Sequence, residues 1–200
     1  MQHIFKKNTS EITLVLLHGT GGNEHDLLPI AKMIDPDANV LSIRGQILEN
    51  GMPRFFKRLK AGVFDEKDLI YRTHELKGFI DEASVTYSFD RDKVIVFGYS
   101  NGANIASSIL FHYKKAFKAA ILSHPMIPFK DVHLPDLADL DIFIGAGSND
   151  PLTTLDETNQ LKEIYEHANA KVSMYLGNFG HSLSKDELDE VIKWYKTLTL

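Results

Sequence analysis

Short apolar runs separated by turn-forming residues recur along the chain. Within each run the apolar residues are consecutive instead of alternating with polar ones, which is typical of strands buried on both faces of a parallel sheet. The runs cover residues 12–17, 40–43, 94–97, 119–122, 142–146 and 172–176. We therefore expect a sheet of mostly parallel strands.

Between these runs, apolar residues recur at three- and four-residue spacing, which predicts amphipathic helices. The predicted helical segments are residues 23–34, 68–87, 104–113, 155–169 and 184–198. Asn23 is the expected N-cap of the first segment, because a short polar side chain there can accept a hydrogen bond from a free backbone N–H. The expected buried stripe of the second segment is Leu69, Leu76, Phe79, Ile80 and Ala83.

The alternation of strands and helices predicts right-handed crossovers, with helices on both faces of the sheet. A chain of 200 residues is long enough to bury one large hydrophobic core. No repeat, low-complexity tract or linker divides it. We therefore expect a single α/β domain spanning residues 1–200.

Residues 44–65 interrupt this alternation with a mixture of basic and aromatic side chains. The segment contains Arg44, Met52, Arg54, Phe55, Phe56, Lys57, Arg58, Lys60 and Phe64. A loop of this length is usually functional or disordered, and its aromatic content argues against disorder. Two interpretations remain open with equal weight: residues such as Arg54 and Phe55 contact a substrate, or the phenylalanines anchor a surface excursion in the core.

The apolar run at 94–97 leads into Gly98-Tyr99-Ser100-Asn101-Gly102, a Gly-x-Ser-x-Gly pattern, and then into a predicted helix. A serine exposed at a strained strand-to-helix turn crowds the positions two before and two after it, so these must lack side chains. The alternative, a structural serine in an ordinary turn, is less compatible with this context. Ser100 is therefore the candidate nucleophile.

A serine nucleophile needs a base to take its proton and an acid to orient that base. In strand-to-helix elbows the chain order is serine, acid, histidine. Asp150 follows the run at 142–146, and His181 follows the run at 172–176, each where a partner is expected. The competing histidines are His112, His124, His133 and His167, and the competing acids are Asp139, Asp141 and Asp156. Among them, His124 is expected to line the cleft.

The negative oxygen of an acyl-transfer intermediate requires two preorganised N–H donors. One is expected at Asn101, directly after the serine, and the other at Thr20, in the glycine-rich loop after the first apolar run. This loop lacks the lysine of a phosphate-binding loop and the glycine spacing of a dinucleotide fingerprint. His18, His25 and Asp26 match no strong zinc spacing, so we expect no metal.

Composition limits the class of protein further. The net charge of −5 argues against a nucleic-acid partner, and the absence of cysteine excludes a disulfide framework and a cysteine nucleophile. The first apolar run is too short to span a bilayer and lacks a secretory layout, so we expect no membrane partner. These features favour a soluble, cytoplasmic protein, and they leave a homodimer open.

Together, His18-Gly-Thr-Gly-Gly, Gly98-Tyr-Ser-Asn-Gly, Asp150 and Gly180-His181 resemble the α/β-hydrolases of the phospholipase/carboxylesterase family, which includes acyl-protein thioesterases. The segments RGQILENGMPRFFKRL and GVFDEKDL resemble a bacterial subset of small carboxylesterases linked to quinone stress. The resemblance implies an α/β-hydrolase fold, a Ser100–His181–Asp150 triad, an oxyanion hole at Thr20 and Asn101, and no cofactor. Gly22, Tyr99 and Asn101 depart from the usual thioesterase motifs, which argues against long-chain or protein substrates.

We therefore expect a serine hydrolase whose substrate is a small or medium-sized carboxylic ester. The 19 or so residues between the runs at 119–122 and 142–146 are too few for a helical cap, so the cleft should have no substantial lid. Met126 and Ile127 are candidate substrate contacts, with loop anchoring as the alternative. Other functions remain open: a thioesterase or lysophospholipase, a non-hydrolytic lyase, or a non-catalytic binding protein on the same fold.

Overall fold

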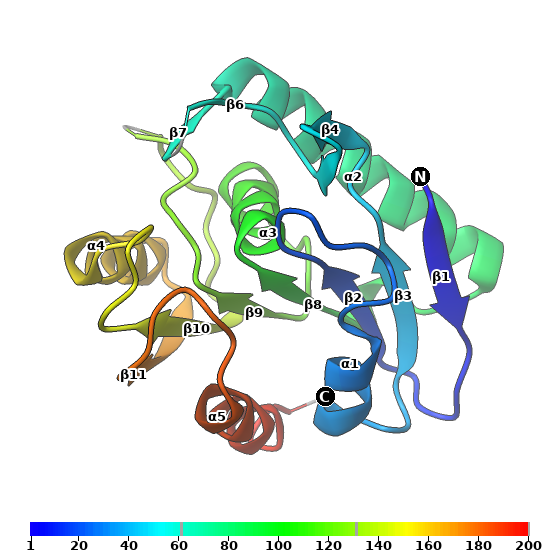
Figure 1. Ribbon diagram of the computed structural model, residues 1–200. Helices are drawn as coiled ribbons and strands as arrows, with labels where there is room; N and C mark the ends of the chain where they lie inside the picture. Colours follow the sequence, from blue (N-terminus) through cyan, green and yellow to red (C-terminus); the bar gives the residue numbers. More distant parts are fainter. Residues whose placement is uncertain (61, 131, 200) are drawn as a thin grey trace.

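The computed structural model describes residues 1–60, 62–130 and 132–199. A seven-stranded sheet with the order β1-β3-β2-β8-β9-β10-β11 lies at its centre (Figure 1). Its strands are β1 (His3–Lys6), β2 (Thr13–Leu17), β3 (Asn39–Ile43), β8 (Val94–Tyr99), β9 (Ala119–Ser123), β10 (Asp141–Gly147) and β11 (Lys171–Gly177). All neighbouring strands are parallel except β1 and β3. The mostly parallel sheet predicted from the apolar runs is confirmed.

The apolar runs do not predict strand β1. It lies at the edge of the sheet, where none of its residues is fully buried, so it lacks a continuous apolar run. Phe5 nevertheless packs inward and stacks on Tyr87 with ring centroids 4.2 Å apart. With four residues, β1 is also shorter than the other edge strand, the seven-residue β11, whose longer apolar run predicted it.

Helices cover both faces of the sheet, as predicted (Figure 1). They are α1 (Leu28–Ile34), α2 (Glu66–Tyr87), α3 (Asn101–His112), α4 (Leu155–His167) and α5 (Lys185–Tyr195), with a 3-10 turn at Arg91–Lys93. Helices α2, α3 and α4 pack on one face, whereas α1 and α5 pack on the other. Alternate side chains of β2 separate the two cores, because Val15 and Leu17 join the first while Leu14 and Leu16 join the second.

Helix α1 begins later than the sequence pattern predicts. Asn23 is not its N-cap: its Oδ1 accepts a hydrogen bond from the His25 N–H within a preceding turn. The helix begins at Leu28, next to Pro29. Proline has no N–H to donate and a fixed φ, so it suits the first helical turn, and this local constraint determines where the helix begins.

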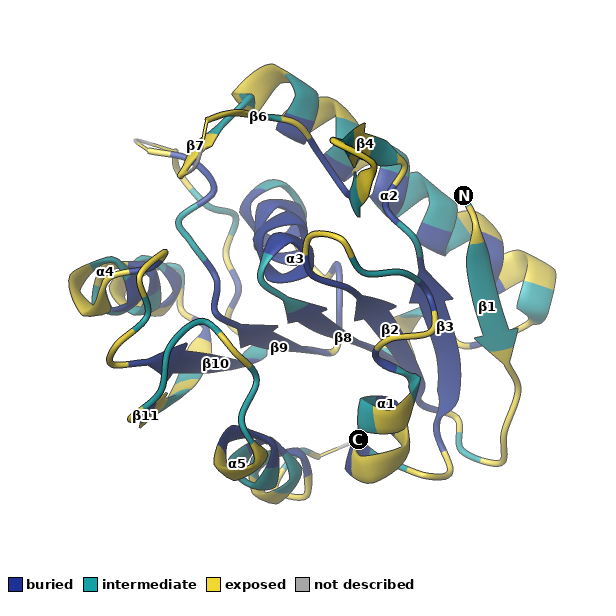
Figure 2. Ribbon diagram, in the orientation of Figure 1, coloured by how far each residue is buried: buried dark blue, intermediate teal, exposed yellow. Residues whose placement is uncertain are grey.

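The described residues of the 44–65 segment, 44–60 and 62–65, contain two small hairpins, which contribute to the cleft at the carboxyl ends of the strands. One pairs β4 (Ile47–Glu49) with β5 (Met52–Arg54), and the other pairs β6 (Arg58–Lys60) with β7 (Val63–Phe64). Phe55 and Phe56, between the hairpins, are buried in the core beside α2 and α3. Figure 2 shows a buried stretch of chain between β4 and β6, while parts of these two strands are exposed. The phenylalanine anchors predicted by one interpretation are present.

The segment from His124 to Leu140 connects β9 to β10 without forming a cap. Its described residues, which exclude residue 131, contain no helix. The carboxyl ends of the central strands are therefore not covered by a helical lid.

Candidate active site

Ser100 occupies a sharp turn between β8 and α3. Its backbone has φ 51° and ψ −112°, a conformation that L-residues rarely adopt. A Cβ atom at Gly98 would lie 2.6 Å from the Gly102 carbonyl oxygen, and one at Gly102 would lie 1.9 Å from the Leu17 carbonyl oxygen. The two glycines are therefore required for the close approach of α3 to β2 and β8. This is the steric reason that the sequence pattern predicted.

A continuous chain of hydrogen bonds links Ser100 to His181 and Asp150. The Ser100 hydroxyl lies 2.7 Å from His181 Nε2, and His181 Nδ1 lies 2.7 Å from Asp150 Oδ2. Because a carboxylate only accepts, His181 carries its proton on Nδ1 and presents Nε2 to the serine as an acceptor. The structure brings these three residues together from the ends of β8, β10 and β11.

Asp150 is held in its charged form. Burial of its carboxyl group opposes the charge, but backbone and histidine donors outweigh burial and lower its pKa below the usual value. Asp150 Oδ1 accepts from the N–H groups of Leu152 at 2.8 Å and Thr153 at 3.2 Å. The backbone of the turn after β10 therefore holds Oδ1 in place, and Oδ2 remains free to accept hydrogen bonds from histidine side chains.

A second histidine, His124, shares the same carboxylate oxygen. Its Nδ1 lies 2.8 Å from Asp150 Oδ2, and its Nε2 lies 3.3 Å from Oε2 of Glu187, on α5. The side chains of His124 and Glu187 are both 0% exposed. The sequence pattern predicts that His124 lines the cleft, but it indicates neither this contact nor the burial of Glu187.

Glu187 has a misleading sequence context. It stands three residues after Ser184, the N-cap of α5, in the pattern of a capping box. Only half of that box forms: Ser184 Oγ accepts from the Glu187 N–H at 3.1 Å, while the Glu187 side chain turns into the protein interior. A charged residue in the first turn of a helix normally signals solvent exposure, so no local pattern reveals its burial.

His124, Asp150 and His181 offer nitrogen and oxygen atoms within 4.8 Å of one another. This spacing alone would suit a metal ion. However, both Nδ1 atoms must carry protons to donate to the single oxygen Asp150 Oδ2, and a protonated nitrogen cannot bind a metal. The hydrogen bonds therefore favour a cluster in which both histidines donate protons to Asp150 over a metal site.

Thr20 and Asn101, the predicted oxyanion donors, line the same cleft as Ser100. Within the described ranges, neither backbone N–H is used in a hydrogen bond. The Thr20 loop is tied to β5 by two contacts: Arg54 Nη1 donates to Thr20 Oγ1 at 2.7 Å, and the Gly21 N–H donates to the Pro53 carbonyl at 2.9 Å. Both N–H groups are therefore available for a ligand: that of Thr20 on a loop that is fixed in place, and that of Asn101 at the start of α3.

His18 is a structural residue of this loop. Its Nε2 accepts from the Gly45 N–H at 3.0 Å, which assigns the ring proton to Nδ1, the donor to the Gly19 carbonyl at 2.6 Å. Burial lowers its pKa, which favours this neutral form. Both ring nitrogens of His18 are therefore used by backbone groups and are not available to a metal.

The cleft at Ser100 has a volume of 310 Å³ and cationic side chains on its wall. Its lining includes Arg54, Arg58, Phe64, Met126 and Leu152. Of the predicted substrate contacts, Arg54 and Met126 therefore line the cleft. Phe55 does not: it is 3% exposed, its ring packs against His18, and its N–H donates to Asn101 Oδ1 at 2.7 Å.

Ile127 also lies outside the lining of this cleft. Its N–H donates to Glu157 Oε1 at 3.1 Å, which ties the loop after β9 to α4. Its side chain packs against the core on that face. Ile127 thus fits the loop-anchoring alternative, while its neighbour Met126 faces the ligand space.

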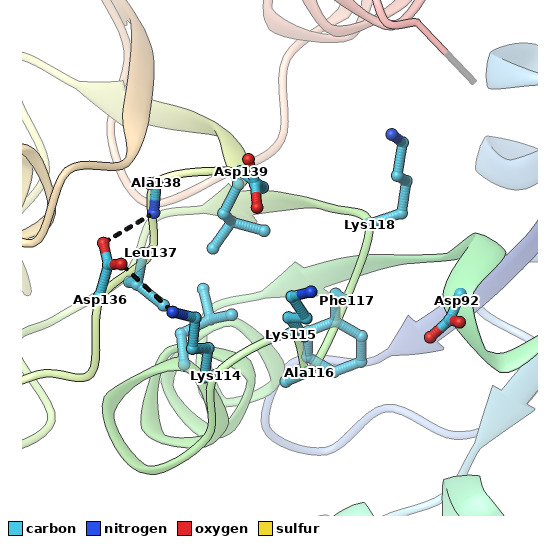
Figure 3. Close-up of a pocket in the computed structure, with 12 residues that line it drawn as sticks. Asp92, Lys114, Lys115, Ala116, Phe117, Lys118, Asp136, Leu137, Ala138 and Asp139 are labelled. Carbon is cyan, nitrogen blue, oxygen red and sulfur yellow. Dashed lines mark hydrogen bonds and ion pairs between the residues drawn. The ribbon is translucent and has the colours of Figure 1, made fainter.

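A separate cavity of 240 Å³ lies between the Lys114–Lys118 and Asp136–Leu140 segments (Figure 3). Asp139, a competing acid in the sequence, lines this cavity. Both segments precede strands, β9 and β10, so the cavity lies at the amino ends of strands whose carboxyl ends carry the Ser100 cluster. It contains none of the candidate catalytic residues.

None of the remaining competitors, His112, His133, His167, Asp141 and Asp156, lines the cleft at Ser100. Three of them lie at helix ends. His167 ends α4 and bonds the Glu163 carbonyl, and His112 ends α3 and bonds the Ser108 carbonyl. Asp156 lies in the first turn of α4, where a carboxylate interacts favourably with the helix dipole. Helix termini therefore account for all three.

A mostly parallel sheet that presents a strained serine at the end of a central strand, followed directly by a helix, is the architecture of α/β-hydrolases, and this chain has that fold. The phospholipase/carboxylesterase family model matches residues 3–199. The chain belongs to this family.

Proteins similar in sequence to this chain include a bacterial hydrolase and fungal thioesterases. Over 196 residues the chain is 57% identical to the Bacillus subtilis protein described as putative hydrolase MhqD, covering 98% of each chain. It is 28% identical to acyl-protein thioesterase 1 of Candida albicans, covering 96% of this chain and 94% of that one.

Solved structures show the same similarity. The carboxylesterase of Bacillus cereus superposes with a TM-score of 0.97 at 52% identity, covering 98% of this chain and 93% of that one. YahD, solved with malic acid, superposes with a TM-score of 0.93 at 32% identity, covering 98% of each. Over the described part of the chain, no helix has the length and apolarity needed to cross a membrane.

Proposed function

We propose that this protein hydrolyses small to medium-sized carboxylic esters through an acyl-enzyme formed on Ser100. The observation that carries the proposal is the hydrogen-bond chain from Ser100 Oγ through His181 to Asp150. A serine hydroxyl becomes a competent nucleophile when a neighbouring base removes its proton. Membership of the phospholipase/carboxylesterase family supports the same reaction class.

The mechanism follows from the roles of these groups. Ser100 Oγ attacks the acyl carbonyl carbon while His181 Nε2 accepts the serine proton, and Asp150 stabilises the imidazolium. The Thr20 and Asn101 N–H groups bind the negative oxygen. His181 then gives its proton to the departing alcohol, and a water molecule repeats the sequence on the acyl-enzyme. No cofactor is needed for any of these steps.

Active-site labelling tests this mechanism. A fluorophosphonate probe is expected to label the wild-type protein at Ser100 and to leave the Ser100→Ala variant unlabelled. Ser148→Ala, which removes an exposed serine, is the matched control and should label normally. Absence of Ser100 labelling in folded wild-type protein would contradict the proposal.

A thioesterase or lysophospholipase activity is the alternative within the same chemistry. The similarity to acyl-protein thioesterase 1 of Candida albicans favours it. Turnover of short- and long-chain esters and thioesters separates the two functions. Highest kcat/KM for long-chain thioesters would replace the carboxylesterase proposal, whereas highest kcat/KM for short esters would support it.

Arg54 and Met126 are the proposed substrate contacts, and Arg58 lies in the same wall. Arg54 and Arg58 share one carboxylate, that of Glu49, so this wall carries a surplus of positive charge. Such a surplus favours an ester that bears an anionic group. Malic acid, present in the YahD structure, is a dicarboxylic acid and is consistent with this preference. The comparison of monomethyl succinate with methyl butyrate tests it, and equal kcat/KM would contradict it.

We also propose a cytoplasmic location. The absence of cysteine fits a reducing compartment. Fractionation of the source cells, followed by detection of the protein, tests this proposal, and recovery in the secreted fraction would contradict it.

A further inference from the structure

His124 lies behind the proposed triad, in the loop that follows β9. Its backbone is fixed in the left-handed region at φ 56°, and its N–H donates to the Gly145 carbonyl at 2.8 Å. Its ring lies 5.0 Å from the His181 ring, centroid to centroid, and both imidazoles donate to Asp150 Oδ2. The proposed hydrolysis does not itself require a second imidazole on this carboxylate.

The hydrogen-bond geometry determines how many protons this cluster holds. Asp150 Oδ2 only accepts, so His124 Nδ1 carries a proton. His124 Nε2 lies at ion-pair distance, 3.3 Å, from Glu187 Oε2 without forming a hydrogen bond, and within the described residues neither Nε2 nor either Glu187 oxygen has another hydrogen-bond partner. A lone pair on Nε2 would face a buried carboxylate at this distance, which is repulsive. A proton must therefore lie between His124 and Glu187.

That proton is expected on the imidazole. Burial opposes a charge on His124, but the carboxylates of Glu187 and Asp150 outweigh burial and raise its pKa. The titratable groups around the ring are Asp150 after β10, Glu187 on α5, His181 before α5 and Tyr99 on β8. Burial and the same two carboxylates raise the pKa of Tyr99, which therefore stays neutral. Two buried carboxylates thus surround one imidazole.

We propose that His124 and Glu187 form a buried ion pair that positions Asp150 and weakens the hold of this carboxylate on the His181 proton. The inference rests on the proposed hydrolysis, in which His181 must be deprotonated to accept the Ser100 proton. Asp150 contacts the His124 imidazolium directly, with Oδ2 2.8 Å from Nδ1, whereas Glu187 contacts the other ring nitrogen, Nε2. Asp150 therefore stabilises a proton on His181 less than an unshared carboxylate would. His124 and Glu187 are positioning residues that keep His181 available as a base at lower pH.

Nuclear magnetic resonance of the histidine ring nitrogens tests the ion pair without any assay of activity. The wild-type protein is labelled with ¹⁵N-histidine, and the His124 signals are assigned from their loss in His124→Gln. We expect both His124 nitrogens to carry protons at neutral pH. A neutral ring with an unprotonated Nε2 would overturn the ion pair, whether or not the protein hydrolyses esters.

The pH profile of kcat/KM tests the positioning role. In Glu187→Gln the amide can donate to the Nε2 of a neutral His124, which preserves the contact and removes both charges. The acid limb of the profile reports protonation of the general base in the free enzyme, and we expect it to move up by about 0.5–1 pH unit. A folded Glu187→Gln protein with an unmoved acid limb would overturn the role.

The matched control is Glu190→Gln on the same helix. Glu190 is paired with Lys193 at the surface, so this variant makes the same change of charge without touching the cluster. Its acid limb should coincide with that of the wild type. If Glu187→Gln fails to fold, the ring-nitrogen measurement on the wild type still decides whether the ion pair exists. If the wild-type protein lacks esterase activity, the proposed function is wrong. The ring-nitrogen measurement still shows whether His124 and Glu187 form an ion pair.

Discussion

Gly145 makes room for Glu187. A Cβ atom at position 145 would lie 1.9 Å from Glu187 Oε1, so the carboxylate fills the space that this strand residue leaves empty. The absence of a side chain in β10 therefore allows a charged residue of α5 to reach His124 at the carboxyl end of β9.

Gly145→Ala should destabilise the protein by about 1–3 kcal/mol, because the added methyl group must displace the buried Glu187 carboxylate from its contact with His124. Urea denaturation measures the loss. Gly78→Ala is the control: a Cβ there meets nothing within 4 Å, and alanine favours the helical state of α2. It should leave stability unchanged or raise it. Equal effects of the two variants would contradict the steric explanation.

Ser100→Gly should be more stable than Ser100→Ala by about 1 kcal/mol. Both variants lose the hydroxyl, but only glycine relieves the strain of φ 51°. Parallel urea denaturation of the two variants measures the difference. Equal stability would show that the surrounding contacts, and not the backbone conformation, dominate at this turn.

Arg54 and Thr20 should act as one unit in catalysis. Arg54→Lys cannot reproduce the guanidinium contacts that reach both Thr20 Oγ1 and the Phe56 carbonyl, and Thr20→Val removes the hydroxyl acceptor but keeps the backbone N–H. Each variant should lower kcat/KM for a neutral ester by about 10-fold, because the oxyanion donor loses its support. The double variant should lose little more than either single variant. Fully additive losses would mean that the two residues act independently.

Because Phe55 is buried, Phe55→Ala should reduce the stability of the protein and not its ester selectivity. Removal of a core phenylalanine should cost about 3–5 kcal/mol of unfolding free energy, since the ring packs against His18 in the interior. Selectivity between neutral esters should change little in protein that remains folded. Thermal denaturation and an ester panel measure the two effects. A large change in selectivity with unchanged stability would contradict this role.

The raised pKa of His124 also predicts how stability depends on pH. A group whose pKa is raised by folding contributes stability that is fully present below its unfolded pKa of about 6.5 and is lost as pH rises through the folded pKa. The destabilisation caused by His124→Gln should therefore be larger at about pH 6 than at about pH 9. Urea denaturation at both pH values measures it, with the exposed His167→Gln variant as control. If the destabilisation caused by His124→Gln instead increased with pH, the pKa of His124 would not be raised by folding.

Local sequence determined the parts of this protein that local physics constrains. Consecutive apolar residues predicted six of the sheet strands. Five of these, β2, β3, β8, β9 and β10, are buried on both faces, which favours apolar residues at consecutive positions, and the sixth is the edge strand β11. Gly98 and Gly102 marked the turn at Ser100 because only glycine tolerates such close backbone contact. The chain order of Ser100, Asp150 and His181 followed from the strand ends at which they stand.

Tertiary structure alone decided which side chains meet across the sheet. Phe55 and Arg54 are neighbours in sequence, yet Phe55 enters the core while Arg54 lines the cleft, because strand β5 ends at Arg54 and the chain bends at Phe55. Glu187 has the sequence context of an exposed helix terminus, but the space above Gly145 and the position of His124 bring it inside. Such contacts depend on strand order, helix placement and side-chain direction over long sequence separations, for which the chain carries no local signal.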